Sequence, residues 1–139
     1  MRMLNNFCKE YRVYYEDTDS GGVVYYANYL KFLERARTDF IRSLNISQSE
    51  IIAKHNLAFV VKSCKVNFIK PAKLDDLLLV SVNIKNVGIA SIAIYQEIFC
   101  DSKIISKAEI EIVFVDLKSF KPKKIEKSLR DILMSKVAI

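Results

Sequence analysis

The chain has 139 residues, with 22 Lys and Arg against 16 Asp and Glu and a formal net charge of +6. This length fits one domain, and a hydrophobic fraction of 51% excludes an intrinsically disordered chain. No apolar run reaches the ~18 residues that span a bilayer, and no signal peptide is recognisable, so the sequence predicts a cytoplasmic protein.

Rare residue types exclude several kinds of site. The only glycines are Gly21, Gly22 and Gly88, which leaves no P-loop, no dinucleotide-binding fingerprint and no nucleophile elbow. The three cysteines form no C-x-x-C pair, so neither zinc nor thioredoxin-like chemistry is predicted, and we expect them to be small buried residues. No nucleic-acid-binding motif accompanies the positive charge.

The first half of the chain alternates between strand and helix patterns. Residues 8–15 are rich in Tyr and Val and predict a strand, followed by an acidic turn at 16–22. Apolar residues at helical spacing predict a helix over 28–44, buried on most sides. Ser47 and Glu50 form a capping-box pattern that predicts a shorter helix ending near Lys54.

The second half of the chain predicts an antiparallel meander. Its expected strands, separated by turn residues, are 57–69, 77–86, 89–100 and 103–117. A basic irregular stretch at 118–124 precedes an expected helix at 125–136. The element order favours an α+β fold in which an antiparallel sheet wraps the long helix, and the exposed sheet edges favour a homodimer.

The acidic turn holds the residues that indicate chemistry. Asp19 lies shortly before the long helix, so its carboxylate is expected beside free N–H groups and the positive end of a helix dipole. The carboxylate can attack a carbonyl or activate water, while N–H groups around Tyr26 and Ala27 hold the carbonyl oxygen. The sequence therefore indicates a hydrolase site. On spacing alone, an Asx-turn or helix cap is the stronger interpretation of Asp19.

A longer set of motifs extends this hypothesis over about residues 8–118. The motifs are Arg12-Val13, Thr18-Asp19, Gly22-Val23-Val24, Tyr26-Ala27-Asn28-Tyr29, Glu34-Arg35-Ala36-Arg37, Ala58-Phe59-Val60-Val61-Lys62 and Lys70-Pro71-Ala72-Lys73-Leu74-Asp75-Asp76. In them the chain resembles the hotdog-fold 4-hydroxybenzoyl-CoA thioesterase family. Within that family it is most similar to the bacterial acyl-CoA thioesterases associated with the Tol–Pal system.

The resemblance implies a hotdog fold, in which a five-stranded antiparallel sheet wraps a long central helix. It implies one domain over residues 1–139, with a core at about 8–118 and a basic, helical C-terminal segment at 119–139. It also implies homodimers or homotetramers with active sites at the dimer interface, and hydrolysis of acyl-CoA to a free acid and coenzyme A without cofactor or metal. Asp19 is then the catalytic carboxylate, and the backbone N–H of Tyr26 polarises the carbonyl. The expected substrate-binding residues are Gly22, Val23, Tyr26, Ala27, Asn28, Val60 and Ser91.

Some assignments keep two interpretations. The Tyr26 ring either lines the acyl pocket or serves packing, and for Asn28 a helix cap is favoured over contact with the thioester. Glu34 and Arg37, three apart on the helix, are expected to pair with each other. The C-terminal lysines are solvated, or they attract coenzyme A phosphates, acyl carrier protein or an anionic membrane surface, which would make the protein peripheral to the inner membrane.

Two other functions compete with hydrolysis. One is a non-catalytic acyl-thioester-binding or scaffold protein at the membrane. The other is a hotdog acyl-thioester dehydratase, which is disfavoured because it requires a histidine in the site. The only histidine is His55, well beyond the Asp19 turn.

Overall fold

The long helix predicted from the apolar spacing is α1 (Tyr29–Ser43) in a computed structural model that describes residues 7–137. Its core-facing side chains are Tyr29, Phe32, Leu33, Ala36, Phe40 and Ile41. Leu30, an apolar residue of the same helix, is 46% exposed. Burial is therefore confined to one face, and the expectation of a helix buried on most sides is wrong.

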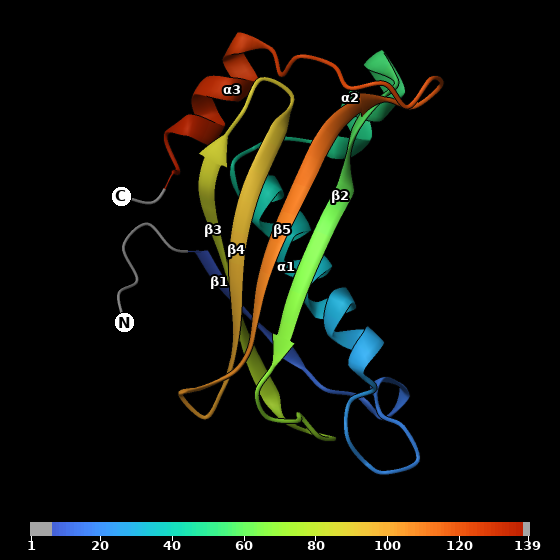
Figure 1. The fold of residues 1–139 in the computed structure, drawn as a ribbon, viewed down its shortest axis with the longest axis vertical. Helices are drawn as coiled ribbons and strands as arrows, with labels where there is room; N and C mark the ends of the chain where they lie inside the picture. The colour runs from blue at the N-terminus through green and yellow to red at the C-terminus, as the bar shows by residue number, and fades with distance from the viewer. Residues whose placement is uncertain (1–6, 138–139) are drawn as a thin grey trace.

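A five-stranded antiparallel sheet packs against this buried face of α1, and in Figure 1 the helix lies behind it. In chain order the strands are β1 (Phe7–Arg12), β2 (Leu57–Phe68), β3 (Leu77–Val87), β4 (Ser91–Cys100) and β5 (Lys103–Asp116). Across the sheet the order is β1-β3-β4-β5-β2, so β3, β4 and β5 form the predicted meander. The predicted α+β hotdog architecture is confirmed.

Gln96 shows which face of the sheet meets the central helix. Its Nε2 donates to the backbone oxygens of Leu33 in α1 (3.0 Å) and Ser81 in β3 (3.2 Å). Its Oε1 accepts from Arg37 Nη1 at 2.9 Å. Because side chains alternate along a strand, the even-numbered positions around Gln96 in β4 face α1 and the odd-numbered ones face away. These hydrogen bonds lie in a mostly apolar layer, and the sheet also buries Ser81 and Ser106.

The predicted pairing of Glu34 with Arg37 is wrong. Arg37 reaches across to Gln96, whereas Glu34 accepts from the Thr38 hydroxyl one turn along the helix. The buried amide of Gln96 offers Arg37 a partner that exposed Glu34 does not match, since a hydrogen bond away from water is stronger.

Two shorter helices cover one end of the layer. Helix α2 (Gln48–His55) begins at the predicted cap, where Ser47 Oγ accepts from the Glu50 N–H at 3.2 Å. Helix α3 (Lys127–Met134) lies within the range predicted to be helical. No helix in residues 7–137 is long and apolar enough to cross a membrane.

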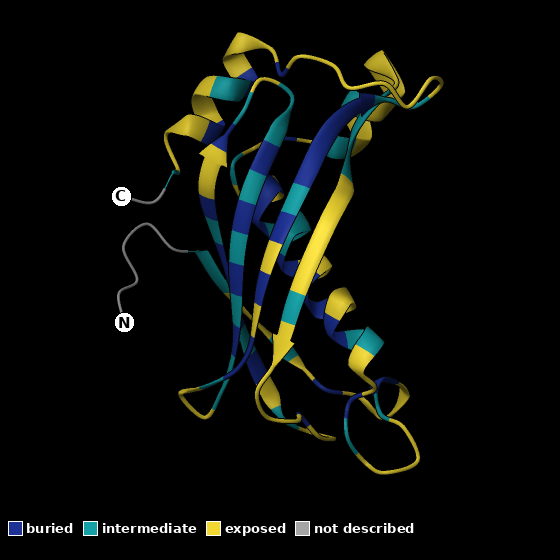
Figure 2. Cartoon of the chain, in the orientation of Figure 1, coloured by how far each residue is buried: buried dark blue, intermediate teal, exposed yellow. Residues whose placement is uncertain are grey.

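Strand β2 forms an exposed edge of the sheet, as the long exposed stretch in Figure 2 shows. On one side it pairs with β5, and within the described chain its other side has no strand neighbour. Cys64 lies on this strand and is exposed, and Cys8 and Cys100 are only half-buried, so the expectation that the cysteines are buried is wrong. The exposure of Cys64 follows from the edge position of β2, which sequence periodicity does not reveal.

Candidate active site

Asp17 holds the acidic turn together from inside. It is 4% exposed, and its Oδ2 accepts from the Tyr14 N–H at 2.9 Å, closing a short 3-10 turn, η1 (Tyr15–Asp17). Its backbone oxygen accepts from the Tyr25 N–H (3.1 Å) and from Asn28 Nδ2 (2.8 Å). The predicted Asn28 cap is wrong, because this side chain turns back to Asp17 and makes no capping bond. Asp17 thus joins the two ends of the loop.

Asp19 lies exposed in the middle of that loop. Its Oδ1 accepts from the Gly21 N–H at 2.8 Å, which is the Asx-turn considered from the sequence. Its backbone N–H donates to Val23 at 2.9 Å, and its carbonyl accepts from the Gly22 N–H at 3.0 Å. Gly22 has φ +84°, a conformation that glycine adopts freely. Asp19 Oδ2 has no hydrogen-bond partner among residues 7–137 and is open to a ligand.

Unused backbone donors follow the loop. A 3-10 turn, η2 (Tyr26–Asn28), leads directly into α1. The Asn28 N–H donates to Tyr25 at 2.8 Å, but the N–H groups of Tyr26 and Ala27 have no acceptor in the part of the chain that the structure describes. Donors at the start of a helical segment favour a negatively charged oxygen. The arrangement supplies a carboxylate and an oxyanion-binding turn from one short segment.

Aromatic side chains line a cavity of about 250 Å³ beside this turn. The Phe68 ring meets Tyr29 at 5.2 Å and Tyr26 at 6.3 Å between ring centroids, both edge to face. The buried Tyr29 hydroxyl accepts from the Ala72 N–H at 2.9 Å, and burial raises the pKa of Tyr29. The lining residues are Val24, Tyr26, Tyr29, Phe68, Ile69, Lys70 and Pro71. Sequence reasoning missed Phe68 and Ile69, whose only signal was their place at the end of a strand.

The segment after β2 also anchors the loop. The Val24 N–H donates to Ala72 at 2.8 Å, and Val23 forms an isolated antiparallel bridge with Lys73. Six of the eight residues assigned to catalysis or binding thus gather in one place, around Asp19. These assignments are the Asp19 carboxylate, the Tyr26 N–H, Gly22, Val23, Ala27 and Asn28.

Val60 and Ser91 lie far from this loop within one chain. Both pair with Val113, one from each side of β5, on the sheet face that points away from α1. Val60 is eight residues before Phe68 along β2, roughly 26 Å at the usual rise per strand residue. The structure therefore brings Val60 and Ser91 together with each other, but not with Asp19.

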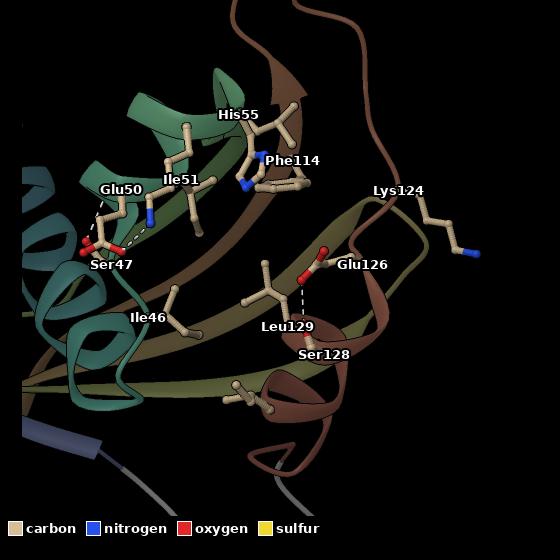
Figure 3. A pocket seen from close by; sticks show the side chains of 13 residues that line it. Ile46, Ser47, Glu50, Ile51, His55, Phe114, Lys124, Glu126, Ser128 and Leu129 are labelled. Atoms are coloured by element: carbon tan, nitrogen blue, oxygen red, sulfur yellow. Dashed lines mark hydrogen bonds and ion pairs between the residues drawn. The ribbon is translucent and has the colours of Figure 1, made fainter.

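A second cavity, of about 370 Å³, contains the only histidine (Figure 3). It lies between α2 and α3, where His55 stands beside Phe114, and Glu50, Lys54 and Glu126 contribute charged groups to its lining. This cavity is at the end of the sheet where β2 begins, opposite the Asp19 loop (Figure 1). His55 and Asp19 therefore do not share a site within one chain.

Comparisons with known proteins agree on one family. Residues 13–133 match the family described as the thioesterase-like superfamily. The acyl-CoA thioesterase YbgC of Haemophilus influenzae is 46% identical over 118 residues, covering 85% of this chain and 87% of that protein. A probable thioesterase from Bartonella henselae superposes with a TM-score of 0.83 at 31% identity, covering 87% of this chain and 99% of that one. A 4-hydroxybenzoyl CoA thioesterase mutant complexed with 4-hydroxybenzoyl CoA shares the fold, with a TM-score of 0.86 at 17% identity, covering 93% and 99% of the two chains.

Proposed function

The chain belongs to the thioesterase-like superfamily, and on that premise we propose that it hydrolyses acyl-CoA thioesters with Asp19 as its catalytic carboxylate. The products are a free carboxylic acid and coenzyme A. The relatives named as acyl-CoA thioesterases support the reaction, and the geometry of the loop supports the residue assignments.

One observation carries the assignment of Asp19. Its carboxylate is fixed through Oδ1 at 2.8 Å from the Gly21 N–H, whereas Oδ2 has no partner among residues 7–137. Through its backbone oxygen, Asp17 fastens this loop to the turn that presents the free N–H groups of Tyr26 and Ala27. A positioned carboxylate and a positioned pair of donors are the two elements that thioester hydrolysis needs.

The chemistry requires only this machinery because a thiolate is a good leaving group. In one route Asp19 attacks the thioester carbon, the C–S bond breaks, and water then hydrolyses the mixed anhydride. In the other, Asp19 removes a proton from water, which attacks the same carbon directly. In both routes negative charge develops on the carbonyl oxygen, where the N–H groups of Tyr26 and Ala27 stabilise it. Neither route needs a metal or cofactor.

We assign the acyl group to the aromatic cavity beside the turn. At about 250 Å³ it is smaller than a typical pocket for a whole ligand, so it suits the acyl portion alone. Tyr26 and Phe68 present ring edges and faces there, which suits a short acyl chain or a single aromatic ring. This favours the pocket-lining interpretation of the Tyr26 ring over simple packing.

A homodimer would complete the site. The outer edge of β2 offers twelve residues of backbone for pairing with a second copy, and exposed Val61 and Phe68 offer apolar surface. Antiparallel pairing of two such strands places the beginning of one β2 beside the end of the other. Val60 of one copy would then approach the aromatic cavity of its partner, which would account for its place among the expected substrate contacts.

The first test is release of free thiol from a panel of short, long and aromatic acyl-CoAs. Asp19→Asn should lower turnover by at least about 10²-fold while the melting temperature stays near that of the wild type, because shape and volume barely change. Glu16→Gln is the matched control, since it removes an exposed carboxylate three residues away. Equal turnover in Asp19→Asn and wild type would refute the assignment of Asp19. An absence of turnover in the wild type with every acyl-CoA would refute the proposed substrate class.

Location and partners stay predictions from the sequence. These are a cytoplasmic protein associated with the Tol–Pal system, and attraction of the basic segment to coenzyme A phosphates or acyl carrier protein. Within one chain His55 lies in the cavity between α2 and α3, so a dehydratase would need His55 of a second copy at the Asp19 loop.

A further inference from the structure

Residues 117–124, within the connection from β5 to α3, form a hydrogen-bonded loop that carries one exposed aromatic ring. We call it the Phe120 loop. The Phe120 N–H donates to the Asp116 carbonyl at 2.6 Å, and the N–H groups of Lys118 and Ser119 donate to Asp116 Oδ1 at 2.8 and 3.0 Å. In return, the Asp116 N–H donates to the Lys121 carbonyl at 3.0 Å. These bonds fix the path of the loop and hence the position of the ring.

Phe120 is held in a conformation that a bulky residue rarely adopts. Its φ is +57°, in the left-handed region, and its side chain is 65% exposed. Glycine or asparagine would fit this backbone with less strain. The ring gains little from burial in the chain, so folding does not explain an aromatic residue here. Strained residues of this kind concentrate at functional surfaces.

Lysines precede and follow Phe120 in the loop. Within the described residues, four exposed lysines of the loop form no ion pair, whereas Lys127, at the start of α3, pairs with Asp131 at 3.0 Å. The four lysines are Lys118, Lys121, Lys123 and Lys124. Free ammonium groups on a hydrogen-bonded loop favour a surface of negative charge.

A second apolar side chain lies at the same end of the molecule. Ile89, in the turn between β3 and β4, is 74% exposed, and its carbonyl accepts from the Ile125 N–H at 2.9 Å. The chain from Phe120 to buried Ile125 therefore connects the exposed ring to the turn that carries exposed Ile89. In Figure 1 this segment crosses the top of the view, while the Asp19 loop lies at the bottom.

We propose that the Phe120 loop, together with Ile89, docks the protein on a surface of anionic phospholipid. Phe120 and Ile89 enter the boundary between headgroups and acyl chains, and the loop lysines face the lipid phosphates. A lipid surface offers apolar and anionic layers side by side, as the loop does. A soluble phosphate or an acidic protein surface would use the lysines and leave both apolar side chains in water. The proposal concerns where the protein binds and does not depend on the hydrolysis proposed above.

Co-sedimentation with vesicles tests this surface. The wild type should bind vesicles of phosphatidylcholine mixed with phosphatidylglycerol and should bind far less to phosphatidylcholine alone. Phe120→Asn keeps the left-handed backbone without the ring and should weaken binding about tenfold. Lys121→Gln with Lys123→Gln should weaken it by a similar factor. The matched control is Lys103→Gln with Lys107→Gln, which removes the same charge from exposed positions elsewhere on the molecule and should leave most binding intact.

Insertion of the ring can be seen directly, because the chain has no tryptophan. Phe120→Trp should retain binding, and its emission should shift to shorter wavelength with anionic vesicles. Tyr15→Trp, at a residue 81% exposed near the other end, should show no such shift. The proposal is overturned if the wild type does not bind anionic vesicles, or if the control pair weakens binding as much as the loop pair. It is also overturned if the loop variants change only the KM for acyl-CoA, which would assign the lysines to coenzyme A, or only the binding of acyl carrier protein.

Discussion

Gln96→Leu should destabilise the protein strongly, although Leu has nearly the same volume and suits an apolar layer. Gln96 is fully buried and makes three hydrogen bonds, to Leu33, Ser81 and Arg37. The two neutral bonds contribute about 1 kcal/mol each, and the bond from the Arg37 guanidinium about 2 kcal/mol. The apolar gain from Leu offsets about 1 kcal/mol. The free energy of unfolding should therefore fall by about 3 kcal/mol, which lowers the melting temperature by roughly 10 °C.

Most of this loss of stability should come from the buried Arg37 guanidinium, which loses its partner in Gln96→Leu. Burial already lowers the pKa of Arg37, and without Gln96 its guanidinium loses its one hydrogen-bond partner among residues 7–137. Arg37→Leu combined with Gln96→Leu removes both partners and should recover about 1–2 kcal/mol relative to Gln96→Leu alone. Denaturant unfolding of the wild type, the two single variants Gln96→Leu and Arg37→Leu, and the double variant measures this coupling. All four are compared at one fixed protein concentration, because association of copies would otherwise shift the apparent stability. A loss below about 1 kcal/mol, or the same loss in the Arg37→Leu background, would refute the reasoning.

Three other predictions test the sheet edge, the β1–α1 contact and the strained loop. Val61→Lys places a charge on the free edge of β2 and should convert a dimer to a monomer by light scattering; an unchanged mass would count against pairing through β2. Burial opposes ionisation of Asp39, but the Tyr11 hydroxyl, Lys9 and Arg42 outweigh it and hold the pKa of Asp39 below its usual value. The stability that Asp39 contributes is therefore present above about pH 4 and is lost as the pH falls through the lowered pKa. Asp39→Asn should accordingly lose less stability in acid than the wild type. The same decrease in the free energy of unfolding with falling pH in both proteins would contradict this. Phe120→Asn should raise the free energy of unfolding by about 0.5–1 kcal/mol in thermal melts, because Asn adopts a positive φ at lower cost, and a decrease would show that the ring stabilises the fold.

Local patterns in the sequence were sufficient for most of the fold. Apolar residues at helical spacing predicted α1 to within one residue at each end, and the Ser47–Glu50 pattern located the start of α2. Turn residues such as Gly88 and Asp101 marked the boundaries between β3, β4 and β5, which pair as the predicted meander. These signals succeed because each depends on residues that are close together in the chain.

The features that the sequence did not reveal depend on distant partners. Asn28 donates to Asp17 instead of capping its helix, and Arg37 finds Gln96 59 positions away. Phe68 meets Tyr26 only because β2 ends beside the turn, and no spacing rule links these two residues. The motif did place Asp19 in the right kind of loop, since the glycines that follow it limit the local conformations.

The strand order also constrains when the Asp19 loop can take shape during synthesis. Within the described residues, strand β1 pairs only with β3 and β2 only with β5, so the chain up to residue 68 contains two strands whose partners come later in the sequence. The hairpins of β3, β4 and β5 close over short distances and at low entropic cost, whereas β1 and β2 must wait for this template. The loop itself is pinned by Ala72 and Lys73, which follow it by some fifty residues. The Asp19 loop therefore gains its last hydrogen bonds only after later parts of the chain are present, and until then the unpaired edges of β1 and β2 are open to pairing with a wrong strand.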